Sequence, residues 1–229
     1  MVGEKVHFAV EAEFQRKQAR VAGSEKDPRM ASIKERYSGV AIGLHWTIAL
    51  LLLSNIGIAW YFNTLTGTAK LEPVQLHKSI GITVLILSVA RLGWRLAVPA
   101  PKLPGYVTGW EKRLAQTVHV LFYVVMLGMP LSGWAMSSAS PLIKVFPITL
   151  FHVVPWPAMS FLSNLPHDQM KQAHGVFMAT HGLLAKLAYG LIVLHVAGAL
   201  KHQFLSNDDV VARMIPFLRR GRAASAETA

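Results

Sequence analysis

Apolar residues in this chain gather in four long runs separated by polar or proline-rich segments. Each run is close to the roughly 20 residues that an α-helix needs to cross about 30 Å of hydrocarbon. The runs cover about residues 40–62, 78–98, 113–136 and 179–201. The pattern therefore predicts an all-α membrane protein, in which residues 37–216 form a bundle of four transmembrane helices.

The segments outside these runs are predicted to lie at or beyond the membrane surface. Residues 1–36 are polar, and no apolar stretch follows a short basic start, so they do not resemble a cleaved signal peptide. We expect a cytoplasmic arm, disordered or with a short helix over 4–20, and a basic tail over 217–229. Residues 137–176 are oddly apolar, but the apolar part is short and rich in proline, which argues against a further span. We expect a lid in the outer interface rather than a re-entrant segment.

Basic residues set the orientation of the bundle. The arm carries eight Lys or Arg residues, the region between the second and third runs carries five, and the segment from position 201 onward carries five. The opposite side carries four: Lys70, Lys78, Lys144 and Lys171. The positive-inside rule therefore places both termini in the cytoplasm, as in a multi-pass protein of the bacterial inner membrane.

The amino-acid composition excludes several kinds of partner and cofactor. Only 15% of the residues are charged, against about 25% in an average soluble domain. The net charge of +11 fits topogenic charge and attraction to anionic lipid. A nucleic-acid partner is not expected, because no basic stretch carries interleaved aromatic residues for base stacking. The absence of cysteine excludes iron–sulfur clusters, covalently attached haem and disulfides.

Five histidines lie inside or at the ends of the apolar runs, where an ionisable side chain is costly and indicates a functional site. They are His45, His77, His119, His181 and His195. His181 and His195 are 14 residues apart, which is about 21 Å along a helix and about 40° short of four full turns. The two side chains therefore share one face of the fourth helix at opposite membrane depths, which predicts two metal sites.

Matching depth selects the partners on the other helices. His77 begins the second run on the outer side, level with His181. On the inner side, His45 and His119 both lie level with His195 to within about 3 Å. Two histidines at equal depth on different helices can bind haem iron from both faces. Electron transfer is then the expected chemistry, because no iron position stays open for oxygen.

Other uses of these residues are weighed beside haem binding. A single intramembrane histidine can serve as a hydrogen bond between packed helices, and zinc requires four clustered ligands, which two at each depth do not supply. Arg91 and Arg95, at the inner end of the second run, are either topogenic or partners of haem propionates. His202 is a candidate donor to quinone, or an ordinary interfacial histidine.

Four stretches of the chain resemble the prokaryotic cytochrome b561 family, which is related to the cytochrome b subunits of nickel–iron hydrogenases. They read RYSGVAIGLHW, LHKSIGITVLILSVARLGWRL, HVLFYVVMLGMPLSGW and HGLLAKLAYGLIVLHVAGALKHQF, and the stretch DDVVARMIP looks like the usual family ending. The resemblance covers residues 37–216, in the family's order and spacing. The arm over 1–36 departs from the compact family pattern.

The resemblance implies four transmembrane helices, two b-type haems, and quinone, specifically ubiquinone, as a redox partner. By position in the family motifs, it implies that His77 and His181 bind the outer haem and that His45 and His195 bind the inner one. His119 stays an alternative inner ligand, because it also matches a family histidine. Members of the family are described as oxidising superoxide at the outer face.

We therefore expect an oxidoreductase that moves electrons between an outer-face donor, a small molecule or a protein, and membrane quinone. Superoxide is one candidate donor, since the four outer lysines would attract an anion. One alternative is a cytochrome b anchor subunit that relays electrons from a separate dehydrogenase to quinone. Another is a haem-free transporter with histidine relays, although no inverted repeat is evident. The sequence gives no oligomeric state.

Overall fold

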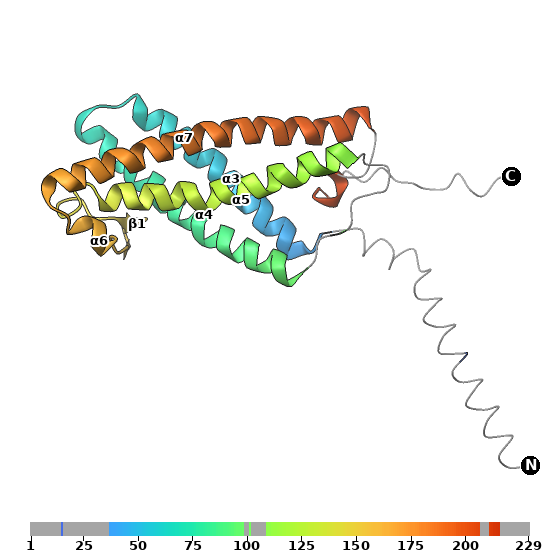
Figure 1. Cartoon of the computed structure of the whole chain (residues 1–229), viewed down its shortest axis with the longest axis horizontal. Helices are drawn as coiled ribbons and strands as arrows, with labels where there is room; N and C mark the ends of the chain where they lie inside the picture. The colour runs from blue at the N-terminus through green and yellow to red at the C-terminus, as the bar shows by residue number, and fades with distance from the viewer. Residues whose placement is uncertain (1–14, 16–36, 99–100, 102–108, 207–210, 216–229) are drawn as a thin grey trace, which may run out of the picture.

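The computed structural model describes residues 15, 37–98, 101, 109–206 and 211–215 of the 229-residue chain. The predicted arm over 1–36, apart from one position, and the predicted tail over 217–229 lie outside the described residues. Long helices joined by shorter elements dominate the described part (Figure 1).

Four of these helices run side by side along the molecule (Figure 1). They are α3 (Gly39–Asn63), α4 (Leu71–Ala97), α5 (Gly109–Ser138) and α7 (His167–Leu200). Each is long and apolar enough to cross a membrane. The predicted all-α fold with four membrane-spanning helices is thus confirmed.

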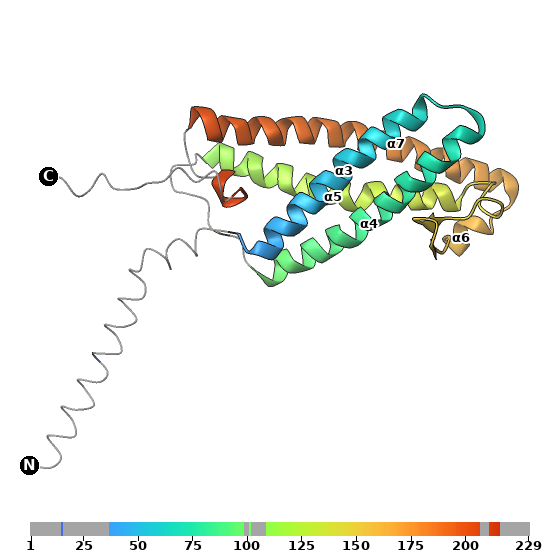
Figure 2. The ribbon, with the colours of Figure 1, turned by 180° about the vertical axis from the view of Figure 1, so that it is seen from behind.

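The bundle has two distinct ends. At one of them, here called the terminal end, α3 and α5 begin and α4 and α7 finish; the connections α3–α4 and α5–α7 lie at the other, the loop end (Figures 1 and 2). At the loop end, the 3₁₀ turn η1 (Gly67–Lys70) leads into α4. At the terminal end, the π-helical turn η2 (Lys201–Leu205) prolongs α7, and the 3₁₀ turn η3 (Val211–Arg213) follows. The indole of Trp46 donates to the carbonyl of Met214 at 3.1 Å, which fastens η3 to α3.

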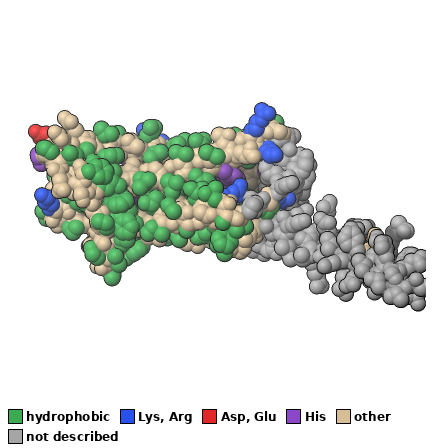
Figure 3. Space-filling model, turned by 60° about the horizontal axis from the view of Figure 1, so that its bottom comes forward, with side chains coloured by type: hydrophobic (Ala, Val, Ile, Leu, Met, Phe, Trp, Pro, Cys, Tyr) green, Lys and Arg blue, Asp and Glu red, His purple; other side chains and the backbone are tan. Residues whose placement is uncertain are grey.

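The helices pack as two pairs. α3 and α4 meet around a cluster of Ile48, Ile80 and Val84. α5 and α7 meet around a cluster of Val118, Val125, Ala188 and Leu191. Contacts between α4 and α5 join the pairs. Large apolar side chains also cover the outer surface between charged ends (Figure 3), a distribution that suits lipid rather than water.

Two of the helices, α4 and α7, start well before their apolar runs. α4 begins at Leu71 rather than near position 78, and α7 begins at His167 rather than near position 179. The added turns contain polar residues, including Glu72 and Asp168 in the first turns. Hydropathy marks where a helix lies in hydrocarbon, whereas backbone hydrogen bonding sets where it begins, so these turns extend beyond the apolar stretch.

Residues 139–166, here called the lid, fold over the loop end of the bundle (Figure 1). The lid contains a small antiparallel hairpin of β1 (Thr149–Leu150) and β2 (Val154–Pro155) and the short helix α6 (Ser160–Ser163). Leu162 of α6 packs against Ala135 of α5 in a separate apolar cluster. The short apolar segment predicted as a lid thus folds back on the bundle.

Two buried polar side chains on α4 fasten the lid. The Gln75 amide donates to the carbonyl of Pro147 at 2.9 Å and to the hydroxyl of Thr149 at 2.7 Å. The Ser79 hydroxyl accepts from the backbone N–H of Phe151 at 2.9 Å. Because Gln75 and Ser79 are 3% and 0% exposed, breaking these bonds would leave polar groups unpaired in the interior.

We expect the substitution Gln75→Leu to loosen the lid, because it removes the hydrogen bonds that the Gln75 amide donates to Pro147 and Thr149. A cost of about 1–3 kcal/mol is expected for such a loss. Thermal unfolding in detergent and the rate of limited proteolysis within residues 139–166 measure it. Gln172→Leu, at an exposed position of α7, serves as the control. Equal lid cleavage in both variants would contradict the role of Gln75.

Candidate functional site

At the loop end, α4 and α7 bring two histidines together. His77 and His181, predicted as a pair from matching depth, have ring centroids 6.2 Å apart and planes inclined by 76°. Both side chains are half-buried. Phe62 packs its ring edge-on against His77 at 5.4 Å between centroids. These two histidines are called the loop-end histidines below.

Hydrogen bonds fix the protonation of the loop-end histidines. The Nδ1 atom of His77 lies 3.2 Å from the carbonyl oxygen of Asn55. The Nδ1 atom of His181 lies 3.0 Å from the carbonyl oxygen of Met129 and 3.1 Å from the hydroxyl of Ser132. A carbonyl oxygen can only accept, so Nδ1 is the protonated nitrogen of each neutral ring. Nε2 of each ring is therefore left with a free lone pair for a metal.

A cavity of about 210 Å³ opens beside the loop-end histidines. Both rings line it, and the rest of its wall is largely apolar, with Leu52, Ile82 and Val125 among its residues. Asn55 also lines the cavity, and its side-chain oxygen has no hydrogen-bond partner among the described residues. An apolar space with two convergent imidazoles suits an apolar cofactor bound through a metal.

Three histidines meet at the terminal end. The ring centroid of His195 on α7 lies 6.2 Å from that of His45 on α3 and 5.8 Å from that of His119 on α5. Phe122 packs against His195 at 5.4 Å. The structure thus gathers the whole predicted inner set, and both candidate partners neighbour His195. These three residues are called the terminal-end histidines.

Both sites have the spacing of a metal held between two imidazoles. Metal–imidazole bonds are about 2 Å long, so a metal between two facing rings separates their centroids by about 6 Å. The centroid distances of 6.2 Å for His77–His181 and His45–His195 agree with this value. Two imidazoles supply both axial ligands of a haem iron, whereas zinc requires four clustered ligands. A pair of facing histidines therefore fits haem better than a bare ion such as zinc.

The two arginines predicted as cofactor partners also lie at the terminal end. Arg91 is half-buried on α4, and its charge acts on all three terminal-end histidines. Arg95, about one turn further along α4, is exposed, and its charge acts on His119. The cations are thus close enough to this site to interact with an anionic group bound there.

His202, the predicted quinone contact, lies half-buried in the π-helical turn η2. Its neighbour Lys201 forms an ion pair with Glu111 and lies 5.5 Å above the ring of Trp110. These contacts tie the end of α7 to the beginning of α5. His202 is thereby held at the terminal end, beyond the terminal-end histidines on the same chain segment.

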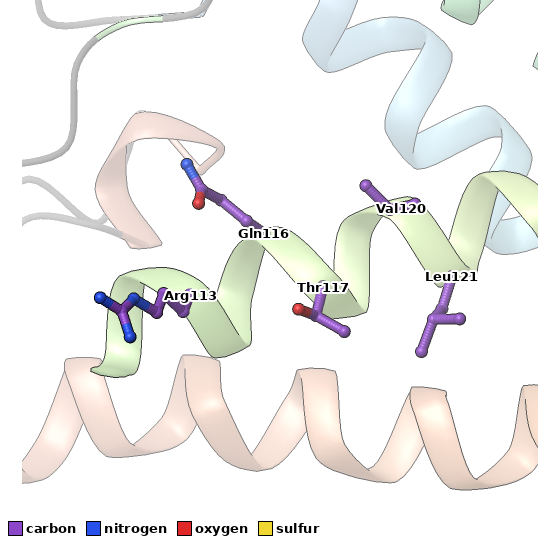
Figure 4. A pocket seen from close by; sticks show the side chains of 5 residues that line it. All are labelled: Arg113, Gln116, Thr117, Val120 and Leu121. Atoms are coloured by element: carbon purple, nitrogen blue, oxygen red, sulfur yellow. The ribbon is translucent and has the colours of Figure 1, made fainter. Parts of the chain in front are cut away.

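A groove of about 430 Å³ runs along α5 near its start (Figure 4). Its lining residues recur every three or four positions, as residues on one side of a helix do. They are Arg113, Gln116, Thr117, Val120 and Leu121. The polar members come first and the apolar ones lie deeper, so the groove is amphipathic. Sequence reasoning did not single it out.

Several residues around the loop-end histidines were also missed at the sequence level. Asn55 and Met129 accept through backbone carbonyls, which every residue carries and which the sequence therefore cannot single out. Ser132 is one of several serines in α5. Gly133 faces His181 so closely that an added Cβ would lie 3.2 Å from Cε1 of that ring. These roles depend on contacts between helices that are remote in sequence.

Comparison with known proteins gives the same family for nearly the whole described chain. The family model described as prokaryotic cytochrome b561 matches residues 36–217. The chain is 28% identical over 188 residues to the probable superoxide oxidase CybB of Yersinia pestis, covering 80% of this chain and 97% of that protein. It is 30% identical to cytochrome b561 homolog 2 of Escherichia coli K12, covering 79% and 92%. It is 26% identical to cytochrome b561 homolog 1 of the same organism, covering 79% and 97%.

We expect Gly133→Ala to displace the ring of His181, because the new Cβ would lie 3.2 Å from Cε1 and 3.4 Å from Nδ1. In a protein with the two haems that the sequence predicts, the low-spin electron paramagnetic resonance signal of the haem at His181 should change, while the other signal stays as in the parent protein. Gly128→Ala is the matched control, since a Cβ there would meet only Leu184 at an ordinary 3.5 Å. Identical spectra for both variants would show that the close approach at Gly133 is unimportant.

Proposed function

The chain belongs to the prokaryotic cytochrome b561 family, and from this premise we propose that it is a dihaem electron carrier linking an outer-face donor to membrane quinone. Family membership makes it a b-type cytochrome of a bacterial membrane that takes part in electron transfer. The proposal adds the number of haems, their ligands, the redox partners and the orientation.

One observation carries the proposal: histidines from different helices face each other at both ends of the bundle, with centroids 6.2 Å apart in each case. His77 and His181 would hold one haem, and His45 and His195 the other, with His119 as the alternative partner of His195. A haem iron with two histidine ligands takes up and gives back one electron and offers no open position to oxygen. At the loop end, hydrogen bonds to Asn55 and Met129 orient the rings.

The orientation follows from the distribution of basic residues. Eighteen Lys or Arg residues belong to the side with both termini and four to the opposite side. The terminal end would accordingly face the cytoplasm, with the chain in the inner membrane, and the loop end with its lid would face outward. Electrons from an outer donor would then enter at the loop-end histidines and leave at the terminal end.

Superoxide is the donor that this arrangement favours among small molecules. The relative from Yersinia pestis is named a probable superoxide oxidase. In this chain, Lys78 lines the loop-end cavity, and its ammonium lies 5.4 Å above the ring of Phe146 in the lid. Lys70 lies 5.4 Å above the ring of Phe62, another cavity residue. Two cations held by aromatic rings at the cavity would attract an anion.

Quinone, ubiquinone in the first instance, would bind at the terminal end. The amphipathic groove on α5 offers hydrogen-bond donors from Gln116 and Thr117 and an apolar wall for a prenyl chain (Figure 4). Gln116 is three residues, about one helical turn, from His119. Arg91, Arg95 and His202 remain the further candidates at this end, for quinone or for haem propionates.

We expect two b-type haems per chain by pyridine haemochrome analysis, with a dithionite-reduced minus oxidised spectrum typical of cytochrome b. His77→Ala and His45→Ala should each lose about one haem because each removes an axial ligand. His119→Ala should keep two. His167→Ala, at an exposed position at the start of α7, is the control. Loss of a haem in His119→Ala but not in His45→Ala would reassign the inner ligand, and absence of haem would overturn the proposal.

We also expect the double variant Lys70→Gln, Lys78→Gln to slow haem reduction by pulsed superoxide by about three- to tenfold, because local positive charge accelerates the encounter with an anion. The dependence of that rate on ionic strength should become shallower. Lys186→Gln, within span α7, removes a charge away from the cavity and should leave the rate unchanged. A reduction rate that depends on salt but not on these two lysines would show that superoxide approaches the haem at another surface.

A further inference from the structure

α4 and α7 repeat the same spacing with different residues. His181 and His195 on α7 are 14 residues apart, and so are His77 and Arg91 on α4. Fourteen residues return to nearly the same face of a helix, about 21 Å further along. Arg91 therefore stands on the histidine face of α4, at the depth where that helix supplies no histidine.

This position makes the terminal end electropositive. Arg91 is the strongest charge acting on His45 and on His195, and it also acts on His119. An arginine keeps its charge at any physiological pH. Figure 3 shows histidine and basic side chains side by side at this end of the molecule. Among the described residues, no hydrogen bond is found on a ring nitrogen of the terminal-end histidines.

The loop-end histidines are in the opposite situation. His77 donates from Nδ1 to one carbonyl, whereas His181 has two acceptors, Met129 O and the Ser132 hydroxyl. The Ser132 hydroxyl itself donates to Met129 O at 2.7 Å, so its lone pairs face the Nδ1–H of His181. Ser132 is only 6% exposed, which keeps water from replacing this bond.

These two environments bias a bound iron in opposite directions. A histidine ligand that donates from Nδ1 gains anionic character and becomes a stronger donor, which stabilises the ferric state and lowers the potential. A fixed cation nearby in a medium of low dielectric stabilises the ferrous state, which carries one positive charge less. The charge of Lys78 would reduce this difference in potential between the two sites. It is, however, the weakest of the electrostatic interactions that act on the ring of His77.

We propose that Ser132 and Arg91 poise the two sites unequally, so that an electron rests preferentially at the terminal end. This inference rests on the proposed haem ligation and gives the proposed direction, from the loop end to the terminal end, a physical cause. Ser132 acts as a positioning residue through His181, and Arg91 acts through its charge.

The test is a potentiometric titration of the purified dihaem protein, followed optically and by electron paramagnetic resonance. The parent protein should show two components, with at least a tenfold preference of the electron for one site, which corresponds to about 59 mV for a one-electron couple. Ser132→Ala should raise the lower potential alone, and Ser132→Thr, which retains the hydroxyl, should restore it. Arg91→Gln should lower the higher potential alone, and Arg91→Lys should largely preserve it.

Matched controls separate these effects from general disturbance. Ser137→Ala removes another buried hydroxyl of α5, one that lines the loop-end cavity, and Lys112→Gln removes an exposed charge at the terminal end. Neither should shift a potential. Two haems whose potentials are unaffected by Ser132→Ala and Arg91→Gln, or shifted in the opposite sense, would overturn this inference while leaving the proposed function intact. Protein without two haems would overturn the proposed function itself.

Discussion

A neutral imidazole between apolar helices has two nitrogens to satisfy, and this requirement organises the loop end of the bundle. One nitrogen donates its N–H to the protein, and the lone pair of the other needs a hydrogen-bond donor or a metal. At the loop end, Asn55 and Met129 present carbonyl oxygens to the rings of His77 and His181. These bonds leave the lone pair on Nε2 of each ring free. In the proposed function, haem binding and helix packing would therefore depend on the same hydrogen bonds.

The helical repeat determines how the sites at the two ends are placed relative to each other. α7 is continuous through both of its histidines, so the two sites are fixed about 21 Å apart along the helix. α4 is equally continuous and places His77 and Arg91 on one face. Two continuous helices thus contribute to two similar sites with different electrostatic surroundings. That difference, rather than the ligands, is what we propose gives electron transfer between two bound haems its direction.

The loop end also carries the lid, which packs against α4. Gln75 and Ser79 are buried under the lid, and Lys78 reaches from α4 to Phe146 within the lid. The lid therefore contacts the same helix that supplies His77. An outer donor would approach through a surface whose cations are held in place by aromatic rings. The terminal end, by contrast, offers the open groove on α5, which suits an amphipathic partner arriving from the membrane.

The sequence by itself determined the four spans, their approximate positions and the grouping of five histidines at two depths, because hydropathy and the helical repeat are local properties of the chain. The stretches that resemble the family are matched by the family comparison over residues 36–217. Only the tertiary structure decided that α4 and α7 extend beyond their apolar runs and that the lid bonds to Gln75. It also decided that Ser132 and Gly133 lie against His181. These contacts join helices remote in sequence, and backbone carbonyls and small residues leave no recognisable pattern in the sequence.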